Sequence, residues 1–357
     1  MRMVAAANSA AMTEQVTERL WVLGPVALVA FILTTGLMLM LRPWLARFAM
    51  VQLNTRSSHH KPTPQGGGIA VIVATLLVAW GGVTLSSNLL PYQGGQLLAV
   101  SGATALLAVV GAIDDIHSLP AAARLAMQCI AVGAVIAALP PEVRVIPHVP
   151  FGIERAGLFL AGVWFVNLVN FMDGIDWMTV AEAVPVTGAI LVLGLAGVMA
   201  PLPALVAAAL LGAMVGFAPF NKPVARIFLG DVGSLPVGLL LGWLLLQLAA
   251  AGHLAAALLL SLYYLADATI TLVQRIARAE MIWQAHRTHF YQRATDRGLS
   301  VTNVVARVFL VNLVLAGLAF ITVAAQNIAV SLAMLGAGGA IVLWVLATFA
   351  SGKDGRQ

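Results

Sequence analysis

The stretch WVLGPVALVAFILTTGLMLML, residues 21–41, decides the fold class of this 357-residue chain. It contains no charged residue, and its length is that of an α-helix crossing the hydrocarbon core of a membrane. The stretch is too long for the apolar core of a signal peptide, and it lacks a small-residue cleavage site. We therefore expect it to stay in the protein as the first membrane span.

Ten further apolar runs of similar length follow, so the sequence predicts an all-α polytopic membrane protein with eleven spans. The chain is 61% hydrophobic and 9% charged, whereas soluble domains carry roughly a quarter charged residues. The strict apolar alternation of a membrane β-barrel is absent. Without the break MAPLP at 199–203, the count would fall to ten. The expected spans lie near residues 21–41, 66–86, 95–113, 120–139, 157–172 (or from nearer Phe151), 178–199, 203–220, 232–251, 254–274, 304–325 and 328–349.

The distribution of Lys and Arg predicts the orientation. With the amino terminus outside, fifteen of the nineteen basic residues fall on one side, which the positive-inside rule assigns to the cytoplasm. This bias and anionic lipid account for the formal charge of +5, so no nucleic-acid partner is expected. The predicted organisation is a periplasmic segment (1–20), one multi-span domain (21–350) and a cytoplasmic tail (351–357). The domain's expected cytoplasmic active-site loops are 42–65, 114–119, 173–177, 221–231 and 275–303.

Five of the eight aspartates lie at the cytoplasmic ends of expected spans. They are Asp114, Asp115, Asp173, Asp176 and Asp231. An ionised carboxylate is costly in or near hydrocarbon, so each needs a partner or a function. Together they predict one site for a metal ion and a polyanion at the cytoplasmic face.

Each acidic segment also has a simpler interpretation. The pair in GAIDDIHSLP (111–120) is either a magnesium- or proton-handling pair or a solvated turn after a helix. In WFVNLVNFMDGIDWM, Asn167, Asn170 and Asp173 step by three and share a helix face, and their oxygens suit Mg²⁺. The alternative is hydrogen bonding between helices by the two asparagines. In NKPVARIFLGDVGS, the helix start at Asp231 favours phosphate binding. The simpler interpretation is that Asp231 or Ser234 only caps the amino-terminal end of the helix.

Two basic segments are expected on the same side. AHRTHFYQRATDRG (285–298) offers His286, Arg287 and His289 to a diphosphate, or forms an amphipathic interfacial helix on lipid headgroups. A zinc site is disfavoured there because no cysteine or third histidine is near. Lys61, before the glycines of KPTPQGGG, offers a point charge to a phosphate, although the glycines could be only a flexible entry into the helix.

Two acids lie inside expected spans, Glu182 and Asp267. Such residues are functional candidates by default. We assign both a structural role satisfied by hydrogen bonds, with Tyr263 and Tyr264 as expected donors to Asp267.

Five segments in this order, HKPTPQGGG, DDIHSLP, NLVNFMDGID, FLGDVGS and HRTHFYQR, resemble the polyprenyl-phosphate N-acetylhexosamine-1-phosphate transferases (glycosyltransferase family 4). The resemblance spans roughly residues 55–300. It implies transfer of N-acetylhexosamine-1-phosphate from a UDP-sugar to undecaprenyl phosphate, giving undecaprenyl-diphospho-sugar and UMP. It further implies Mg²⁺ as cofactor, and a bacterial inner-membrane location with the active site facing the cytoplasm.

The resemblance also implies roles for individual residues. Asp114 and Asp115 would act at the lipid phosphate and its deprotonation, and Asn170 and Asp231 would bind Mg²⁺. Asp173 and Asp176 would lie near the phosphates of the nucleotide sugar, and Asn221 near its uridine. His286, Arg287 and His289 match a loop that closes over the site, and Lys61 matches a basic residue on the amino-terminal side. We also expect Asn167 to bind substrate.

The chain departs from the family pattern at Trp177, where DGIDWM replaces the usual DGIDG. Its HRTH segment, in place of three consecutive histidines, and its eleven expected spans resemble the O-antigen-initiating branch. The alternatives are a peptidoglycan-precursor phospho-MurNAc-pentapeptide transferase, an ion-coupled transporter and a non-catalytic homologue. The identity of the sugar and the oligomeric state, including a homodimer, stay open.

Overall fold

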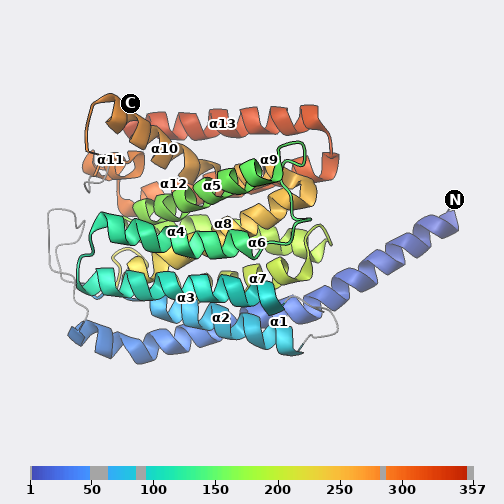
Figure 1. Ribbon diagram of the computed structural model, residues 1–357, viewed down its shortest axis with the longest axis horizontal. Helices are drawn as coiled ribbons and strands as arrows, with labels where there is room; N and C mark the ends of the chain where they lie inside the picture. The colour runs from blue at the N-terminus through green and yellow to red at the C-terminus, as the bar shows by residue number, and fades with distance from the viewer. Residues whose placement is uncertain (1, 49–62, 86–93, 282–286, 352–357) are drawn as a thin grey trace.

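The computed structural model describes residues 2–48, 63–85, 94–281 and 287–351, and its elements are helices (Figure 1). In chain order they are α1 (Arg2–Phe48), α2 (Gly68–Leu85), α3 (Gly94–Ile116), α4 (Ala121–Ala137), α5 (Phe151–Met172), α6 (Met178–Leu195), α7 (Pro201–Phe217), α8 (Asp231–Leu248), the π-helical turn η1 (Ala249–His253), α9 (Leu254–Leu260), α10 (Leu262–Ala277), α11 (Phe290–Asp296), α12 (Val301–Ala325) and α13 (Ile328–Ser351). Within these ranges the extended structure is an isolated parallel bridge between Gln65 and Phe228. The protein is thus all-helical where it is described.

Eight stretches of the described chain are helical, long and apolar enough to cross a membrane. They are Val16–Arg47, Gly68–Leu85, Gly94–Ile116, Phe151–Met172, Met178–Leu195, Asp231–Leu260, Val301–Ala325 and Ile328–Ser351. Two shorter apolar helices, α4 and α7, and the pair α9–α10 occupy the other positions expected to span. A polytopic helical membrane protein is confirmed, while the count of eleven spans and the orientation stay predictions.

Glycine and proline set two of the helix boundaries. Gly197, with a φ of 79°, ends α6, and Pro201 is the first residue of α7. These are favoured positions for the two residues, because glycine adopts positive φ without strain and proline lacks the N–H that a first helical residue leaves unpaired. The expected break at 199–203 is therefore present. Gly252, with a φ of 90°, interrupts the helical path after α8.

The centre of the bundle is formed by α7 and α8. α7 packs against α1, α2 and α6, whereas α8 packs against α3 and α5. α1 and α13 lie at opposite edges of the bundle in Figure 1 and expose large apolar side chains such as Trp21 and Trp344. Exposed apolar side chains on outer helices fit a lipid surrounding.

Several of the expected cytoplasmic loops are partly helical, beginning with 42–65, whose residues to Phe48 belong to α1. α3 continues to Ile116, so Asp114 and Asp115 lie on its last turn. The segment 275–303 contains α11, which lies at the left end of the bundle in Figure 1. The candidate site is at this end.

Candidate active site

Asp115, on the last turn of α3, caps the first turn of α8. Its Oδ1 accepts a hydrogen bond from the backbone N–H of Asp231 at 2.9 Å, and its Oδ2 accepts one from Val232 at 3.1 Å. The two helices can approach this closely because Gly111 has no side chain: a Cβ there would lie 2.2 Å from the carbonyl oxygen of Asp231. The first and third acidic segments of the sequence are therefore in direct contact.

Arg124, in the first turn of α4, links Asp114 to Asp231. Its Nη1 donates to Oδ2 of Asp114 at 2.7 Å and lies 3.9 Å from Oδ2 of Asp231. The other oxygen of Asp114 accepts from the backbone N–H of Leu119 at 2.6 Å. Arg124 was not predicted as a site residue from the sequence. The available signal was its position as the first arginine after the aspartate pair, on the side assigned to the cytoplasm.

The two asparagines of α5 have different partners. Nδ2 of Asn170 donates to Oδ1 of Asp231 and to Oγ of Ser234, both at 2.8 Å. Nδ2 of Asn167 donates to Oε1 of Gln128 on α4 at 2.5 Å. Asn170 therefore joins the acidic cluster. Asn167 makes a hydrogen bond between helices, which was the alternative to metal binding for this segment. Its substrate-binding role stays a prediction.

Asp173 and Asp176 lie in the turn between α5 and α6. Asp173 accepts a hydrogen bond from the hydroxyl of Thr179. Burial raises the pKa of Asp173 to about 8, and repulsion from the carboxylates of Asp231, Asp115 and Asp176 adds to the shift. Asp176 is buried, and its Oδ2 accepts from the backbone N–H of Ala225 at 2.9 Å. All three acidic segments thus meet at one end of the bundle.

Asn221 organises the loop that leads into α8. Its Oδ1 accepts from the backbone N–H of Trp177 at 2.7 Å, and its Nδ2 donates to the carbonyl of Ile227 at 3.0 Å. The side chain is buried. In this structure Asn221 ties the α5–α6 turn to the 218–228 loop, and its predicted uridine contact stays untested.

The glycines of KPTPQGGG bring the start of α2 against the start of α8. Gly67 and Gly68 donate to the carbonyls of Phe228 and Leu229 at 2.9 and 2.8 Å. A Cβ on Gly68 would lie 2.2 Å from Cα of Gly233, so a larger residue would not fit there. The glycines serve a close backbone approach between two segments, which neither interpretation from the sequence described. Lys61 lies outside the described residues.

The carboxylate of Asp267, fully buried on α10, holds the amino-terminal end of α11. Its Oδ1 accepts from the backbone N–H of Phe290 at 3.0 Å and its Oδ2 from that of Tyr291 at 3.2 Å. The hydroxyl of Tyr263 lies 3.3 Å from Oδ2, and Nδ1 of His289 lies 3.3 Å from Oδ1. The predicted structural role of Asp267, with Tyr263 as a donor, agrees with these contacts. Tyr264 was wrongly expected as a second donor, since no hydrogen bond joins its hydroxyl to Asp267 in the described residues.

α11 also contacts the turn that carries Asp173. The hydroxyl of Tyr291 donates to the carbonyl of Phe171 at 3.0 Å, and a Cβ on Gly174 would lie 2.1 Å from that hydroxyl. Arg287 pairs with Asp296 at 3.0 Å, and His286 lies outside the described residues. The histidine segment is thereby positioned beside the acidic cluster.

Glu182 is the second intramembrane acid. It is fully buried on α6, and its Oε2 accepts from Nδ2 of Asn312 on α12 at 2.7 Å. Nδ2 of Asn312 also donates to the carbonyl of Ala181 at 2.9 Å. The contact at Oε2 agrees with the expected structural role, whereas the buried Oε1 has no hydrogen-bond partner among the described residues.

The chemistry of the cluster fits a hard divalent cation, since its side chains offer carboxylate and amide oxygens. Over the described ranges, no group of three or more His, Cys, Asp or Glu side chains closes to metal-holding distances. Asp231 lies at the centre, because Asn170, Arg124 and the N-cap contact with Asp115 all converge on it.

Comparison with known proteins gives the family. A model of "Glycosyl transferase family 4" matches residues 97–249. A "Phospho-N-acetylmuramoyl-pentapeptide-transferase" of Mycobacterium sp. (strain KMS) is 30% identical over 307 residues, 73% of this chain and 84% of the relative. The chain belongs to glycosyl transferase family 4.

Other members of glycosyl transferase family 4 are also similar. A "Probable undecaprenyl-phosphate N-acetylglucosaminyl 1-phosphate transferase" of Bacillus subtilis is 25% identical over 305 residues, 80% of this chain and 82% of the relative. A "Decaprenyl-phosphate N-acetylglucosaminephosphotransferase" of Mycolicibacterium smegmatis is 30% identical over 207 residues, 52% of this chain and 50% of the relative. These similarities support the superfamily that the five sequence segments indicated, and they make the protein a transferase.

Trp177 is the position where this chain departs from the DGIDG pattern noted in the sequence. Its φ of 62° is left-handed, a conformation that favours glycine and costs other residues roughly 1–2 kcal/mol. The indole Nε1 donates to the carbonyl of Ala218 at 2.6 Å, and the backbone N–H donates to Asn221. Trp177 thus keeps the backbone conformation that glycine would adopt, and its side chain adds a contact to Ala218, the residue that follows α7.

Proposed function

We propose that the protein transfers N-acetylhexosamine-1-phosphate from a UDP-sugar to undecaprenyl phosphate, giving undecaprenyl-diphospho-sugar and UMP. We further propose that it acts in the bacterial inner membrane, with the site facing the cytoplasm, and initiates O-antigen or a related envelope glycan. The observation that carries the proposal is that Asn170, Asp115 and Arg124 all contact Asp231, while Arg124 also holds Asp114. A cation site next to several acids suits two phosphate-bearing substrates.

In the proposed reaction, an oxygen of the lipid phosphate attacks the phosphorus that carries the sugar. The bond from this phosphorus to the bridging oxygen breaks, and UMP leaves with that oxygen. Bound by Asp231 and Asn170, Mg²⁺ would offset the negative charge of the diphosphate. We assign Asp173 and Asp176 to the nucleotide sugar, and Asp114 and Asp115 to the lipid phosphate.

The contacts of the aspartate pair refine this proposal. Both oxygens of Asp115 accept backbone hydrogen bonds that hold α8, and one oxygen of Asp114 is paired with Arg124. A phosphate monoester is already mostly ionised at neutral pH, so the reaction does not require a strong base. We assign the pair chiefly to positioning Asp231 and the lipid phosphate.

The decisive experiment uses purified protein with undecaprenyl phosphate, Mg²⁺ and radiolabelled UDP-sugars. The donors are the UDP derivatives of N-acetylglucosamine, N-acetylgalactosamine, N-acetylfucosamine and N-acetylquinovosamine. We expect label in the lipid fraction with at least one donor and its loss in Asp231→Asn. Glu142→Gln, an exposed carboxylate outside the cluster, is the matched control. Folded protein that labels no lipid with any donor would contradict the proposal.

A second candidate is transfer of phospho-MurNAc-pentapeptide, favoured by the name of the Mycobacterium relative. Adding UDP-MurNAc-pentapeptide as a further donor distinguishes the two. A transporter is disfavoured, because its coupling acids are expected near the membrane midplane, whereas these acids cluster at helix ends.

A further inference from the structure

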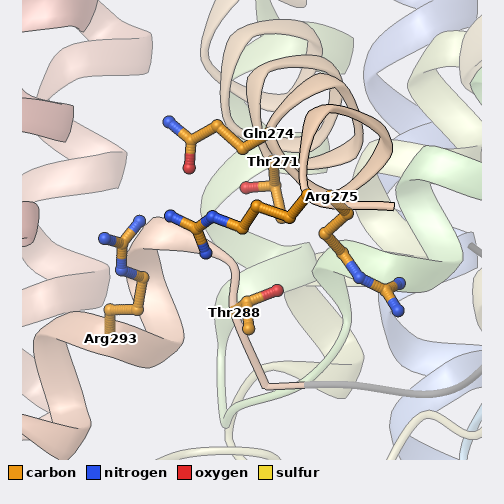
Figure 2. A pocket seen from close by; sticks show the side chains of 6 residues that line it. Thr271, Gln274, Arg275, Thr288 and Arg293 are labelled. Carbon is orange, nitrogen blue, oxygen red and sulfur yellow. The ribbon is translucent and has the colours of Figure 1, made fainter. Parts of the chain in front are cut away.

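A small cavity of about 90 Å³ lies between α10 and α11, apart from the carboxylates of the candidate active site (Figure 2). It is lined by Thr271, Gln274, Arg275, Arg278, Thr288 and Arg293. The lining contains three guanidiniums and two hydroxyls, and it contains no carboxylate. None of the six residues has a role in the proposed transfer reaction.

One wall of the cavity is formed by the last turns of α10 and by Arg278, the residue that follows the helix. Gln274 and Arg275 are each spaced by three or four residues from Thr271 and Arg278, so the side chains lie toward the same side of the helix. Arg275 is only 4% exposed. Its Nε donates to Oε2 of Glu280 at 2.9 Å and its Nη2 to the carbonyl of Met281 at 2.7 Å. This guanidinium is therefore fixed in place, unlike a solvated surface arginine.

The opposite wall comes from α11 and the segment that leads into it. Figure 2 shows Thr288 and Arg293 across the cavity from α10. The guanidinium of Arg293 lies 5.1 Å from the ring centroid of Phe290, a cation–π contact that limits its movement. The backbone N–H of Phe290 is bonded to Asp267 on α10. The same buried carboxylate thus sets the spacing between the two walls.

The charge of the cavity selects its ligand. Glu280 neutralises Arg275 and lies 3.9 Å from Arg278, which leaves the cavity with an excess of positive charge. Guanidiniums bind phosphate oxygens in a fixed, often bidentate geometry, and threonine hydroxyls add neutral donors. We propose that this cavity is a phosphate-binding subsite, occupied by the phosphate of an anionic lipid headgroup or of a soluble ligand.

The test compares the wild type with the double variant Arg278→Gln/Arg293→Gln, which leaves the buried Arg275 in place. Arg297→Gln is the control, since it removes an exposed arginine at the end of α11 that does not line the cavity. One arm measures thermal shifts with inorganic phosphate, without Mg²⁺, in phosphatidylcholine nanodiscs. The other counts phosphatidylglycerol retained in native mass spectra. Neither arm needs turnover, so failure of the proposed transfer reaction would not affect the result.

We expect the double variant to bind at least one probe roughly tenfold more weakly or worse, since it loses at least one charge-assisted contact. The control should bind like the wild type. A loss confined to the lipid arm assigns the subsite to a headgroup, and a loss confined to the phosphate arm assigns it to a soluble ligand. Equal binding of both probes by the wild type and a folded double variant would overturn the proposal, as would a wild type that binds neither.

Discussion

Nδ1 of His289 lies 3.3 Å from Oδ1 of Asp267, a carboxylate that also accepts the first two backbone N–H groups of α11. One buried side chain of α10 therefore positions both the histidine and the helix that follows it. The histidine segment is fixed to the bundle through this carboxylate and through the contact of Tyr291 with Phe171.

We predict that Asp267→Asn lowers both stability and turnover. An amide keeps one acceptor oxygen, so one of the two backbone N–H groups at the start of α11 would lose its acceptor, at a cost of roughly 1–3 kcal/mol. The displaced histidine segment should lower kcat at least tenfold. Thermal unfolding and lipid labelling measure the two effects. Tyr263→Phe, which removes a single neutral donor, should cost less, and the prediction is wrong if it costs as much as Asp267→Asn.

A comparison of two substitutions at Trp177 isolates its backbone conformation. Trp177→Gly and Trp177→Ala both remove the indole and its bond to Ala218, but only glycine adopts a φ of 62° without strain. We expect the glycine variant to be more stable by about 1 kcal/mol. Denaturation in detergent at a fixed lipid content measures the difference. Equal stability of the two variants would mean that the turn relaxes.

The raised pKa of Asp173 predicts a pH dependence of stability in the Mg²⁺-free protein. The folded-state value of about 8 lies above the usual 3.8, so the protonated form is favoured on folding. The contribution of protonated Asp173 to the free energy of unfolding is fully present below about pH 4 and is lost as the pH rises through about 8. Melting temperatures across this window should therefore fall less steeply in Asp173→Asn. An unchanged slope in that variant would assign the dependence to other groups.

Arg124 should matter through its charge. Arg124→Gln leaves Asp114 without its ion-pair partner and brings less positive charge to Asp231. We expect kcat/KM for undecaprenyl phosphate to fall about tenfold or more. Without the guanidinium, the negative charges of Asp114 and Asp231 would be less neutralised and would repel the lipid phosphate. Arg124→Lys should retain part of the activity. Equal losses in the two variants would point to geometry instead of charge.

Cysteine labelling tests the orientation. Cys129 is the only cysteine, so Cys129→Ala gives a background for single substitutions. Ser118 and His148 are exposed and lie in the α3–α4 and α4–α5 connections. With the active site in the cytoplasm, an impermeant maleimide should label His148→Cys in intact spheroplasts and Ser118→Cys only in inverted vesicles. The reverse pattern would contradict the predicted orientation.

The cluster of acids was predictable because each acid lies at the end of an expected helix and the charge bias assigns these helix ends to one membrane face. Once charge bias places Asp115, Asp173 and Asp231 at one membrane face, few arrangements keep them apart. Hydrogen-bond partners were less predictable, since they depend on helix rotation. Asn167 and Asn170 are three residues apart, a turn of about 60° around the helix, which is enough to direct one to α4 and the other to Asp231.

Other parts of the site depend on contacts between distant segments. Arg124 carries no motif of its own, and its role appears only when α4 folds back along α3. The part of the glycines at 66–68 depends on a backbone approach to residues 228–233, which no local pattern encodes. Position 177 was recognised as unusual, but the sequence alone did not reveal that a tryptophan adopts the left-handed conformation there.

The pairing of Gly67 and Gly68 with Phe228 and Leu229 also bears on biosynthesis. The leading end of α2 emerges from the ribosome long before its partner at the start of α8, with α3 to α7 made in between. Until then those amide groups have no native protein partner. The acidic cluster can therefore be completed only late in translation, when α8 enters the membrane beside helices inserted long before it.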